Sequence, residues 1–469
     1  MAQAPATTAD VQRILDQLTE QQKVIQALQT QLADQQRRLD QIQGVTAAAP
    51  AATTPKPAVI AAAAPAPAPA PAPGVAQGAP AASTPKVAAV KAIPAAPRWY
   101  EKYTIRGYVQ LRHDGIVNTN RNLTCDQCDR YIGNGNNFGF RRARLILSGD
   151  VSDRITLYFQ TDFASVVGTA LHMGQIRDLY ADVFLDKKKE FRVRLGQSKV
   201  PFGFENLQSS QNRLSLDRSD PINSAVANER DLGAFFYWAP AKIRTRLATL
   251  ATAGPAGLKG TGDYGVIGMG VYNGQTANRP EANNSLHYVA RAAYPWQLKN
   301  GQYIEAGIQG YTGRYTVTGD QRSLTTKGPA GFTFADQRLA GSVIVYPQPF
   351  GFQAEYNVGK GPQYNPRTQT IETKALRGGY AQTMFMKKYK GQVFTPFYRF
   401  QYYSGGKKQE LDARSYLMRE HELGLEWQQN SFFEISGHYA YSDRRYEDAG
   451  KPNNRQKGSL VRLQFQVNY

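Results

Sequence analysis

The stretch GSLVRLQFQVNY, residues 458–469, alternates apolar and polar residues up to an aromatic side chain at the last position. Alternation at a period of two predicts a β-strand with one apolar and one polar face. A strand at a chain end usually frays unless neighbours hold it on both sides, so this regularity favours a closed barrel. A half-buried sheet of a soluble protein produces the same pattern and remains the alternative.

The same alternation returns in nearly every apolar segment after about residue 100. Clear examples are residues 155–163, 179–185, 350–356 and 433–441. We count about sixteen such segments, an even number of the kind that transmembrane barrels prefer. No run of about eighteen apolar residues is present, so the sequence offers no membrane-spanning helix, and a barrel needs none.

One segment does not fit this count. The stretch KIRTRLATLATAG, which begins at Lys242, is strand-like but would make the number of strands odd. We expect it either to extend a neighbouring strand or to fill a loop, and the sequence leaves the role of residues 242–262 open.

The second face of each strand is polar. Arg106, Gln110 and Arg112, for example, share one parity of their segment. A soluble sandwich turns such residues to bulk water, whereas a transmembrane barrel turns them to a water-filled lumen and its apolar face to lipid. Aromatic groups near segment ends, as in FFYW (235–238), favour the barrel because aromatic girdles lie at both membrane interfaces. We therefore predict an all-β fold, a 16-stranded antiparallel transmembrane β-barrel over residues 99–469.

Residues 9–43 carry a heptad repeat of about five units without a slip, which predicts an α-helical coiled coil. A single amphipathic helix packed on its own domain is the alternative, but glutamine-rich flanks leave only a narrow apolar seam. Gln21 and Gln35 lie in that seam, where polar residues fix register or oligomer number at a cost in stability. The predicted core residues are Val11, Ile14, Leu18, Gln21, Ile25, Leu28, Leu32, Gln35, Leu39 and Ile42.

Residues 44–98 are nearly all Ala, Pro, Thr and Val, and residues 64–73 alternate Ala and Pro without a break. Proline at every second position excludes helix and ladder pairing, so we predict a solvated, polyproline-like linker of about 3.1 Å per residue. A disordered linker without a binding role is favoured over a recognition motif. Residues 1–8 are predicted to be a disordered N-terminus.

The β region carries an excess of positive charge. Residues 1–98 hold 8 of the 56 basic and 5 of the 37 acidic residues, which leaves 48 basic against 32 acidic residues for the rest. A basic excess often indicates nucleic acid binding, but here arginines fall on the lumen parity, and rings of such cations make a pore anion-selective. We expect no nucleic acid partner. The predicted lumen arginines are Arg106, Arg112, Arg142, Arg144, Arg192, Arg194, Arg291, Arg338 and Arg399.

Acidic residues on the lumen parity allow a competing interpretation, in which the arginines are neutralised by ion pairs. Because the cations outnumber the acids, we expect a net positive field to remain in a narrow, low-dielectric passage, where guanidinium groups match phosphate oxygens. The acids are Asp162, Asp178, Asp182, Glu420, Glu422 and Glu426.

Several ordered motifs resemble a known family. GQSKVPFGFENLQSSQNRLSLDRSDP (196–221) and ERDLGAF (229–235) are similar to the strand and constriction loop of the phosphate- and polyphosphate-selective porins of the O and P type. FRRARLILSGDV (140–151), FGFQAEY (350–356), ELGLEW (422–427), FFEISGHYAYSDRR (432–445) and the terminal RLQFQVNY resemble this family as well. The resemblance spans about residues 99–469. It implies a trimeric, sixteen-stranded outer-membrane barrel with a third loop folded inward and a lumen ladder of arginines and lysines.

The resemblance also implies roles for single residues. Arg142 and Arg144 would lie in the lumen near mid-pore, and Arg141, on the other parity, would lie near the outer interface. Ser209 and Ser210 match a hydroxyl pair that hydrogen-bonds phosphate oxygens. The predicted constriction-loop residues are Lys199, Ser209, Ser210, Arg213, Arg218 and Arg230.

The chain departs from the family pattern near the serines. Gln211 and Asn212 stand where lysine is expected, and Glu205 is close by, so the sequence does not predict high phosphate affinity. The resemblance further identifies Phe465, Val467 and Tyr469 as the terminal signal that outer-membrane assembly machinery reads.

Cys125 and Cys128 form a CDQC motif in a long loop. Since a second such motif is missing and the five histidines are scattered, a small disulfide in an oxidising compartment is favoured over a zinc site, and no metal is predicted. No nucleophile elbow or phosphate-cradling glycine loop is visible, so we predict neither an enzyme nor a cofactor.

Two functions fit these observations. The first is an outer-membrane porin that gives passive, anion-selective diffusion of small solutes, phosphate or polyphosphate, as a homotrimer surrounded by outer-membrane lipid and lipopolysaccharide. The second is a structural tether, in which the trimeric coiled coil of residues 9–43 lies in the periplasm and reaches peptidoglycan, while conduction is incidental. A rod that leads into the first strand emerges on the periplasmic side and suits both.

Overall fold

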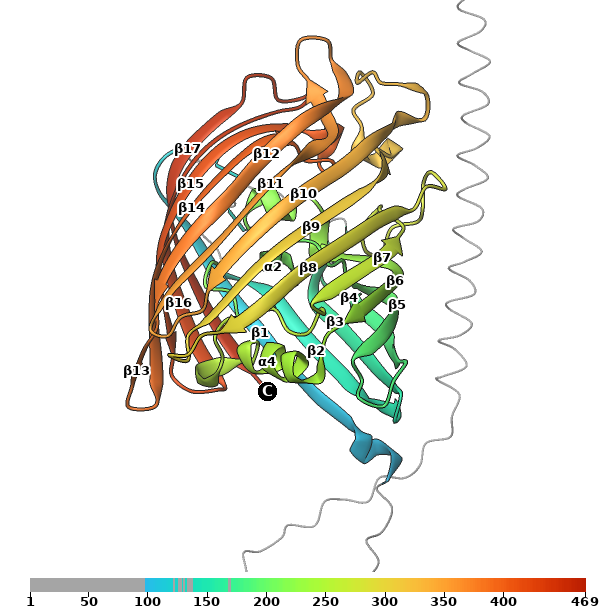
Figure 1. Cartoon of the computed structure of the whole chain (residues 1–469). Helices are drawn as coiled ribbons and strands as arrows, with labels where there is room; N and C mark the ends of the chain where they lie inside the picture. The colour runs from blue at the N-terminus through green and yellow to red at the C-terminus, as the bar shows by residue number, and fades with distance from the viewer. Residues whose placement is uncertain (1–97, 121–122, 125–128, 130, 133–137, 168–169) are drawn as a thin grey trace, which may run out of the picture. The chain divides into compact units, whose positions relative to one another are not determined.

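The computed structural model describes the chain except for residues 1–97, 121–122, 125–128, 130, 133–137 and 168–169. The predicted coiled coil, the predicted linker and the predicted disulfide between Cys125 and Cys128 lie outside the described residues. The described part folds as a closed β-barrel with loops folded into its lumen (Figure 1).

The barrel closes because its first strand pairs with its last. β1 (Tyr103–Thr119) pairs antiparallel with β2 (Phe138–Ser152) on one side and with β17 (Arg455–Asn468) on the other. Every strand between them pairs antiparallel with its neighbours in chain order. The described residues therefore form a closed 16-stranded antiparallel barrel, which confirms the predicted fold.

The sixteen wall strands comprise seventeen segments, because β13 (Lys387–Tyr389) continues β12 (Thr370–Phe385) against their common partner β14 (Gln392–Gly406). The remaining strands are β3 (Ile155–Val167), β4 (Ala170–Phe184), β5 (Phe191–Lys199), β6 (Arg230–Trp238), β7 (Ile267–Tyr272), β8 (His287–Gln297), β9 (Tyr303–Thr316), β10 (Thr333–Val345), β11 (Phe350–Asn365), β15 (Ser415–Gln428) and β16 (Phe433–Glu447). Single 3-10 turns are η1 (Trp99–Lys102), η4 (Gly319–Gln321), η5 (Ala330–Phe332) and η6 (Leu411–Ala413). None of the described helices is long and apolar enough to cross a membrane.

The alternation of β17 shows which way the faces point. Val461 and Val467 are 49% and 48% exposed, whereas Arg462, Gln464 and Gln466 are buried inside the barrel. Apolar residues outside and polar residues inside are the arrangement of a barrel in lipid and the reverse of a soluble sheet. The soluble sandwich is therefore excluded.

The terminal aromatic residue fastens the closure between β17 and β1. The backbone N–H of Tyr469 donates to the carbonyl of Gly107 at 3.0 Å, and the Gly107 N–H donates back at 2.8 Å. The phenol of Tyr469 donates to the backbone carbonyl of Arg144 on β2 at 3.0 Å. A Cβ atom at Gly107 would lie 2.6 Å from the Tyr469 ring, so glycine at this position lets the terminal side chain cross β1.

The two ends of the barrel differ in the length of their connections. Apart from residues 239–266, which connect β6 and β7, the end that holds η1 and Tyr469 has short turns, such as residues 153–154 and 390–391 (Figure 1). The opposite end has long connections, such as residues 200–229 and 317–332. Short turns are periplasmic and long loops extracellular in barrels of this kind, so both ends of the barrel domain lie on the periplasmic side.

Residues 200–229 between β5 and β6, called loop 3 below, fold inward and are almost entirely buried. They include the single-turn helices α2 (Phe204–Leu207) and α3 (Asp220–Asn223) and the 3-10 turn η2 (Ala227–Glu229). The backbone N–H groups of Phe204 and Glu205 donate to Glu355 on β11. Loop 3 therefore crosses the lumen from β5 to the opposite wall.

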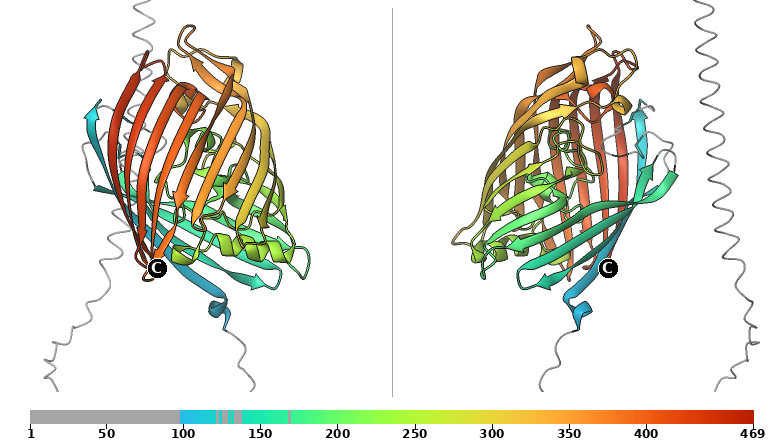
Figure 2. Two further views of the ribbon diagram at one scale, coloured as in Figure 1. Left: turned by 60° about the vertical axis from the view of Figure 1, so that its left-hand side comes forward. Right: turned by 90° about the vertical axis from the view of Figure 1, so that its right-hand side faces the viewer.

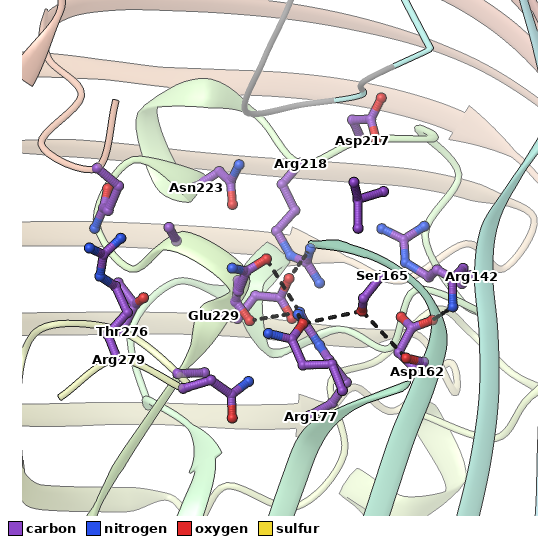
Figure 3. A pocket seen from close by; sticks show the side chains of 18 of the residues that line it. Arg142, Asp162, Ser165, Arg177, Asp217, Arg218, Asn223, Glu229, Thr276 and Arg279 are labelled. Carbon is purple, nitrogen blue, oxygen red and sulfur yellow. Dashed lines mark hydrogen bonds and ion pairs between the residues drawn. The ribbon is translucent and has the colours of Figure 1, made fainter. Parts of the chain in front are cut away.

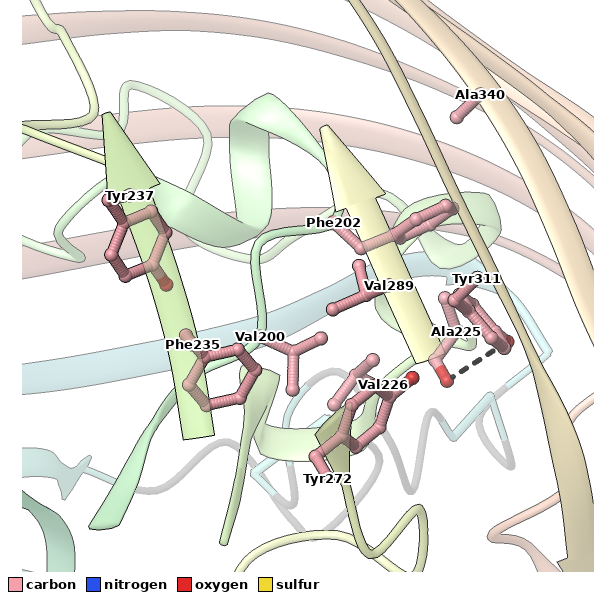
Figure 4. Close-up of a cluster of buried hydrophobic side chains, with 10 residues drawn as sticks. All are labelled: Val200, Phe202, Ala225, Val226, Phe235, Tyr237, Tyr272, Val289, Tyr311 and Ala340. Atoms are coloured by element: carbon pink, nitrogen blue, oxygen red, sulfur yellow. Dashed lines mark hydrogen bonds between the residues drawn. The ribbon is translucent and has the colours of Figure 1, made fainter. Parts of the chain in front are cut away.

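An apolar cluster holds the two ends of loop 3 against the inner wall (Figure 4). Phe202 packs edge-on against Tyr311 of β9, with ring centroids 5.1 Å apart. Burying such a side chain contributes about 1.5–3 kcal/mol, so inward positions are apolar where the loop covers them. The cluster consists of Val200, Phe202, Ala225, Val226, Phe235, Tyr237, Tyr272, Val289, Tyr311 and Ala340.

The segment after Lys242 is a helix and not a strand. α4 (Ala241–Leu250) and the following turn η3 (Gly254–Ala256) lie in the connection between β6 and β7, across the periplasmic end (Figures 1 and 2). Ile243, Leu247 and Leu250 are spaced for one face of a helix and are buried. The segment therefore fills a loop and does not extend a neighbouring strand.

Candidate permeation pathway

Two cavities lie inside the barrel on opposite sides of loop 3. The upper cavity has a volume of about 620 Å³ and is bordered by β2, β3, β4, loop 3 and residues 276–279 (Figure 3). The lower cavity has a volume of about 450 Å³ and lies between loop 3, the first strands and residues 251–264. Arg144 of β2 lines both cavities, so its side chain lies at the boundary between them.

The boundary is a hydrogen-bonded group of three side chains. Arg144 donates from Nη1 to the Tyr108 hydroxyl at 2.7 Å and to Ser210 Oγ at 3.2 Å. The Tyr108 and Ser210 oxygens are themselves 2.5 Å apart. Ser210 belongs to loop 3, so these contacts join the loop to β1 and β2 where the two cavities meet.

The barrel wall forks beside Arg144. β2 and β3 pair only as far as Arg144 opposite Asp162, and above this point β3 pairs with β4 alone. Asp162 Oδ1 accepts the backbone N–H groups of Ala143 and Ala164, both at 3.1 Å, and Oδ2 accepts Arg144 Nε at 3.0 Å. One carboxylate therefore satisfies both strands at the fork and positions the boundary arginine.

Cations outnumber carboxylates in the upper cavity by seven to four. Arg218 forms an ion pair with Glu229. Burial alone would raise the pKa of the Glu229 carboxyl, but Arg218 and Arg230 outweigh it and hold that pKa well below its usual range. The cations are Arg141, Arg142, Arg144, Arg177, Arg218, Arg279 and Arg414, and the acids are Asp162, Asp217, Glu229 and Glu410.

Among the residues that the structure describes, Arg142 and Arg177 line this cavity without a carboxylate partner. Arg142 donates to the amide oxygen of Gln110 at 2.7 Å, and Arg177 donates to the backbone oxygen of Asn228 at 3.3 Å. Arg177 is not among the lumen arginines predicted from the sequence. A bulge in β4 turns both Arg177 and Asp178 inward, which breaks the strict alternation on which that prediction rests.

The lower cavity has five cations against two carboxylates. Lys199 donates from Nζ to the backbone oxygens of Leu207 and Gln208, at 3.0 and 2.7 Å. Arg106 is exposed towards the periplasmic end, and within the described residues neither cation has an ion-pair partner. The cations are Arg106, Arg144, Arg194, Lys199 and Arg230, and the acids are Asp178 and Asp263.

The other predicted lumen arginines hold the loop or the wall. Arg112 pairs with Asp129 and with Asp217 of loop 3, the latter at 3.0 Å. Arg399 pairs with Glu205 of loop 3 at 2.7 Å and also with Glu422. The remaining ones are Arg338, which donates to Pro221 and Ser224 of loop 3, Arg291, which pairs with Glu305, and Arg192 and Arg194, which pair with Asp182.

Each of the six acids on the lumen parity also has a cationic partner. Asp162 pairs with Arg144 and Asp182 with Arg194, as described above. Glu205 is not one of the six, but it also has a cationic partner, Arg399. The other pairs are Asp178 with Arg230, Glu420 with Arg444, Glu422 with Arg399, and Glu426 with Lys259. Within the described part of the chain, no group of three or more His, Cys, Asp or Glu side chains could hold a metal ion.

Some of the loop residues named from the sequence line the cavities, and others are buried within loop 3 or hold it in place. Ser209 lines the lower cavity, and Ser210 lies at the boundary. Arg213 is buried, and none of its guanidinium nitrogens has a hydrogen-bond partner among the described residues. Gln211 and Asn212 hold the loop, because Gln211 donates to Asn468 at 2.9 Å and Asn212 donates to the Ala251 carbonyl at 2.8 Å.

The placement of Arg141 near the outer interface is wrong. Its guanidinium lines the upper cavity and lies 3.7 Å from the carboxylates of both Asp129 and Asp217. The pairing of β1 with β2 shifts register between Gln110 and Leu111, so Arg141 occupies a bulge and does not follow the alternation.

The segment from α4 to residue 264 is the floor of the lower cavity. Leu250 packs with Phe204 of loop 3, with Ile344 of β10 and with Tyr346, which directly follows β10. Lys259 pairs with Glu426 of β15, and Gly254 lies against Ser431 in the turn that follows β15. The floor therefore spans the lumen from β6 towards the far wall and touches loop 3 from below.

A closed sixteen-stranded barrel with an apolar outer face and lumen cavities defines a channel protein of the bacterial outer membrane. The chain belongs to the family described as phosphate-selective porin O and P, which it matches over residues 122–469. This finding confirms the resemblance of the motifs. No significant match is found among curated proteins.

Several solved structures are similar to this barrel. The outer-membrane channel DcaP of Acinetobacter baumannii shares 13% identity over 78% of this chain and 97% of that one, with a TM-score of 0.49. OmpF of Salmonella typhi, in complex with daunomycin, shares 10% sequence identity over 78% of this chain and 97% of that one, with a TM-score of 0.49. An anion-selective porin from Comamonas acidovorans shares 9% sequence identity over 78% of this chain and 99% of that one, with a TM-score of 0.42. Likenesses at this level say nothing about the solute of this barrel.

Proposed function

We propose that this protein is a passive, anion-selective channel for small solutes, with phosphate or polyphosphate as the preferred class. The observation that carries the proposal is the excess of cations in both cavities, seven to four above and five to two below, around one shared arginine. Cations lining a narrow passage attract anions and repel cations.

Four cations without a carboxylate partner among the described residues, together with the boundary arginine Arg144, give the proposed path its steps. An anion would meet Arg142 and Arg177 above loop 3, pass Arg144 at the boundary, and meet Lys199 and Arg106 below it. Each of these cations retains donors that protein carboxylates do not occupy, and charge-assisted hydrogen bonds to an oxyanion are stronger than neutral ones. Several weak sites in series allow a solute to enter and also to leave.

Phosphate is proposed over other anions on chemical grounds and on the family description. Guanidinium forks match two phosphate oxygens at once, and Ser209 and Ser210 place hydroxyl groups beside the path. Gln211 and Asn212 are used to hold loop 3, so we propose weak, selective passage and not tight binding. Glu205 does not oppose this, because Arg399 and Ser219 hold its carboxylate.

The test of phosphate preference is a titration of inorganic phosphate into a chloride current through the purified protein in a planar bilayer. We expect phosphate to reduce the chloride current in the millimolar range, since both anions would share the same cations. A chloride current that does not respond to phosphate, with sulfate as the matched divalent control, contradicts a phosphate-preferring channel and leaves a general anion channel.

We propose further that the protein is a homotrimer and that residues 1–97 act in the periplasm, as a trimeric coiled coil and linker. The start of β1 at the short-turn end supports the periplasmic location. Deleting residues 1–97 separates the alternatives. Conductance and trimers that persist while attachment to peptidoglycan is lost favour the tether, whereas loss of the trimer identifies an assembly role.

A further inference from the structure

We propose that a basic groove on the outer surface of β15, β16 and β17 binds the phosphorylated headgroup of a lipid in the outer leaflet. The groove has a volume of about 430 Å³ and lies on the outward face, outside both lumen cavities. Arg419, Arg445 and Arg455 line it together with Leu417, Asp443 and Asn453.

Strand register gathers these cations. Arg419 lies opposite Asp443, which lies opposite Lys457, and in the next row Leu417 lies opposite Arg445, which lies opposite Arg455. Of the six outward side chains in these two rows, four are cations and one is an acid. Such crowding is unfavourable in itself, because like charges directly opposite one another, as in Arg445 and Arg455, destabilise a sheet.

Two of these cations remain well exposed although each forms an ion pair. Arg455 pairs with Asp443 at 2.9 Å and Arg445 pairs with Glu447 at 3.0 Å, yet the side chains of Arg455 and Arg445 remain 61% and 52% exposed. Both guanidinium groups therefore keep surface for a further anion. An anion bridging them would relieve their repulsion.

The position of the groove identifies the anion as part of a lipid. Towards the periplasm the next row is His421, Tyr441 and Ser459, and the row after it is Leu423, Tyr439 and Val461. The outward surface thus passes from an apolar band through an aromatic row to the basic rows, each step being about 7 Å along the strand. This is the order of acyl chains, interface and headgroups, so the cations lie at headgroup level in the outer leaflet.

The chemistry of the groove favours a phosphate group that carries an apolar tail. Arginine forks bind phosphate oxygens in pairs, and Leu417, which is 45% exposed, lies among them. The apolar band directly below would contact the acyl chains of the same molecule. A free inorganic anion would gain no contact from Leu417 or from the apolar band.

The test is a titration of the full-length protein in detergent with lipid A, read by native mass spectrometry. The test variant is Arg419→Ala/Arg455→Ala, and the control variant is Lys360→Ala/Arg377→Ala, which removes two outward cations of β11 and β12 away from the groove. We expect the test variant to bind lipid A about thirtyfold more weakly, the control variant to bind as the native protein does, and dephosphorylated lipid A to bind poorly to all three. Conductance should be unchanged, because none of these residues lines the cavities.

Three outcomes would overturn the proposal. Equal binding by the test and control variants rules out this groove. Equal binding of dephosphorylated lipid A shows that the phosphate is not recognised, and displacement by inorganic phosphate at the concentration of the lipid identifies a site for a free anion. If the alanine variant does not fold, Arg419→Lys/Arg455→Lys takes its place: it keeps the charge, loses the paired donors, and should still bind lipid A measurably more weakly.

Discussion

Arg142 and Arg144 lie two positions apart on β2 and line the same cavity, but their partners differ. Arg144 is held by a carboxylate, a phenol and a serine, whereas Arg142 donates to the amide of Gln110. Breaking a buried ion pair from one side costs about 3–5 kcal/mol, because the other charge remains buried. Arg144 therefore also holds the wall and loop 3, whereas Arg142 has no carboxylate partner among the described residues.

The double substitution Arg142→Ala/Arg177→Ala should lower the anion preference severalfold and leave the barrel folded, because neither arginine has a carboxylate partner among the described residues. The measurement is the reversal potential in a salt gradient. Arg367→Ala, at the exposed tip between β11 and β12, is the matched control. An unchanged reversal potential in the double variant would show that the ions do not pass the upper cavity.

The Glu229 carboxyl of the upper cavity should stay ionised in mild acid. Its pKa is depressed, so its ion pairs contribute stability at pH values above the ordinary carboxyl pKa of about 4.3, and this contribution is lost only as the pH falls through the lower folded value. Conductance and selectivity should therefore be constant from about pH 8 to about pH 5 as far as this group is concerned. Glu229→Gln releases Arg218 at every pH and should raise the anion preference. A variant with native selectivity would place Arg218 outside the ion path.

At the scale of elements, strict alternation predicted the wall strands and failed wherever a strand bulges or a loop covers the wall. Arg141 and Arg177 lie at bulges, which shift register without a clear sequence signal. Phe235 and Tyr237 point inward although they are apolar or aromatic, because loop 3 packs on them. The helical spacing of Ile243, Leu247 and Leu250 was visible in the sequence, but the strand-like alternation of Thr and Leu residues obscured it.

The floor segment between β6 and β7 should limit conductance from below. Lys259→Ala leaves the buried Glu426 carboxylate without its partner, at a cost of about 3–5 kcal/mol, and should loosen the floor and raise the single-channel conductance. Lys242→Ala, an exposed position in the same segment, is the control. Equal conductance in both variants would mean that ions leave the barrel by a route that does not pass this segment.

At the scale of the whole molecule, the closed barrel follows from a repeating period and a terminal aromatic strand, both of which are local features of the sequence. The division of the lumen into two cavities by loop 3 does not follow from local features. It depends on which inward-facing cations pair with inward-facing acids from segments far apart in the chain. Arg112 with Asp217 and Arg399 with Glu205 are such pairs. The sequence could therefore name lumen arginines but could not tell those that hold loop 3 from those that face a cavity.

The central claim is that the cations without carboxylate partners make this barrel conduct anions. The most direct test is the reversal potential of the purified, full-length protein in a planar bilayer under a potassium chloride gradient. The cation excess in both cavities predicts a potential of the sign set by chloride, which shrinks as the salt concentration rises and screens the lumen charge. A potential near zero, or one of the sign set by potassium, would contradict the account.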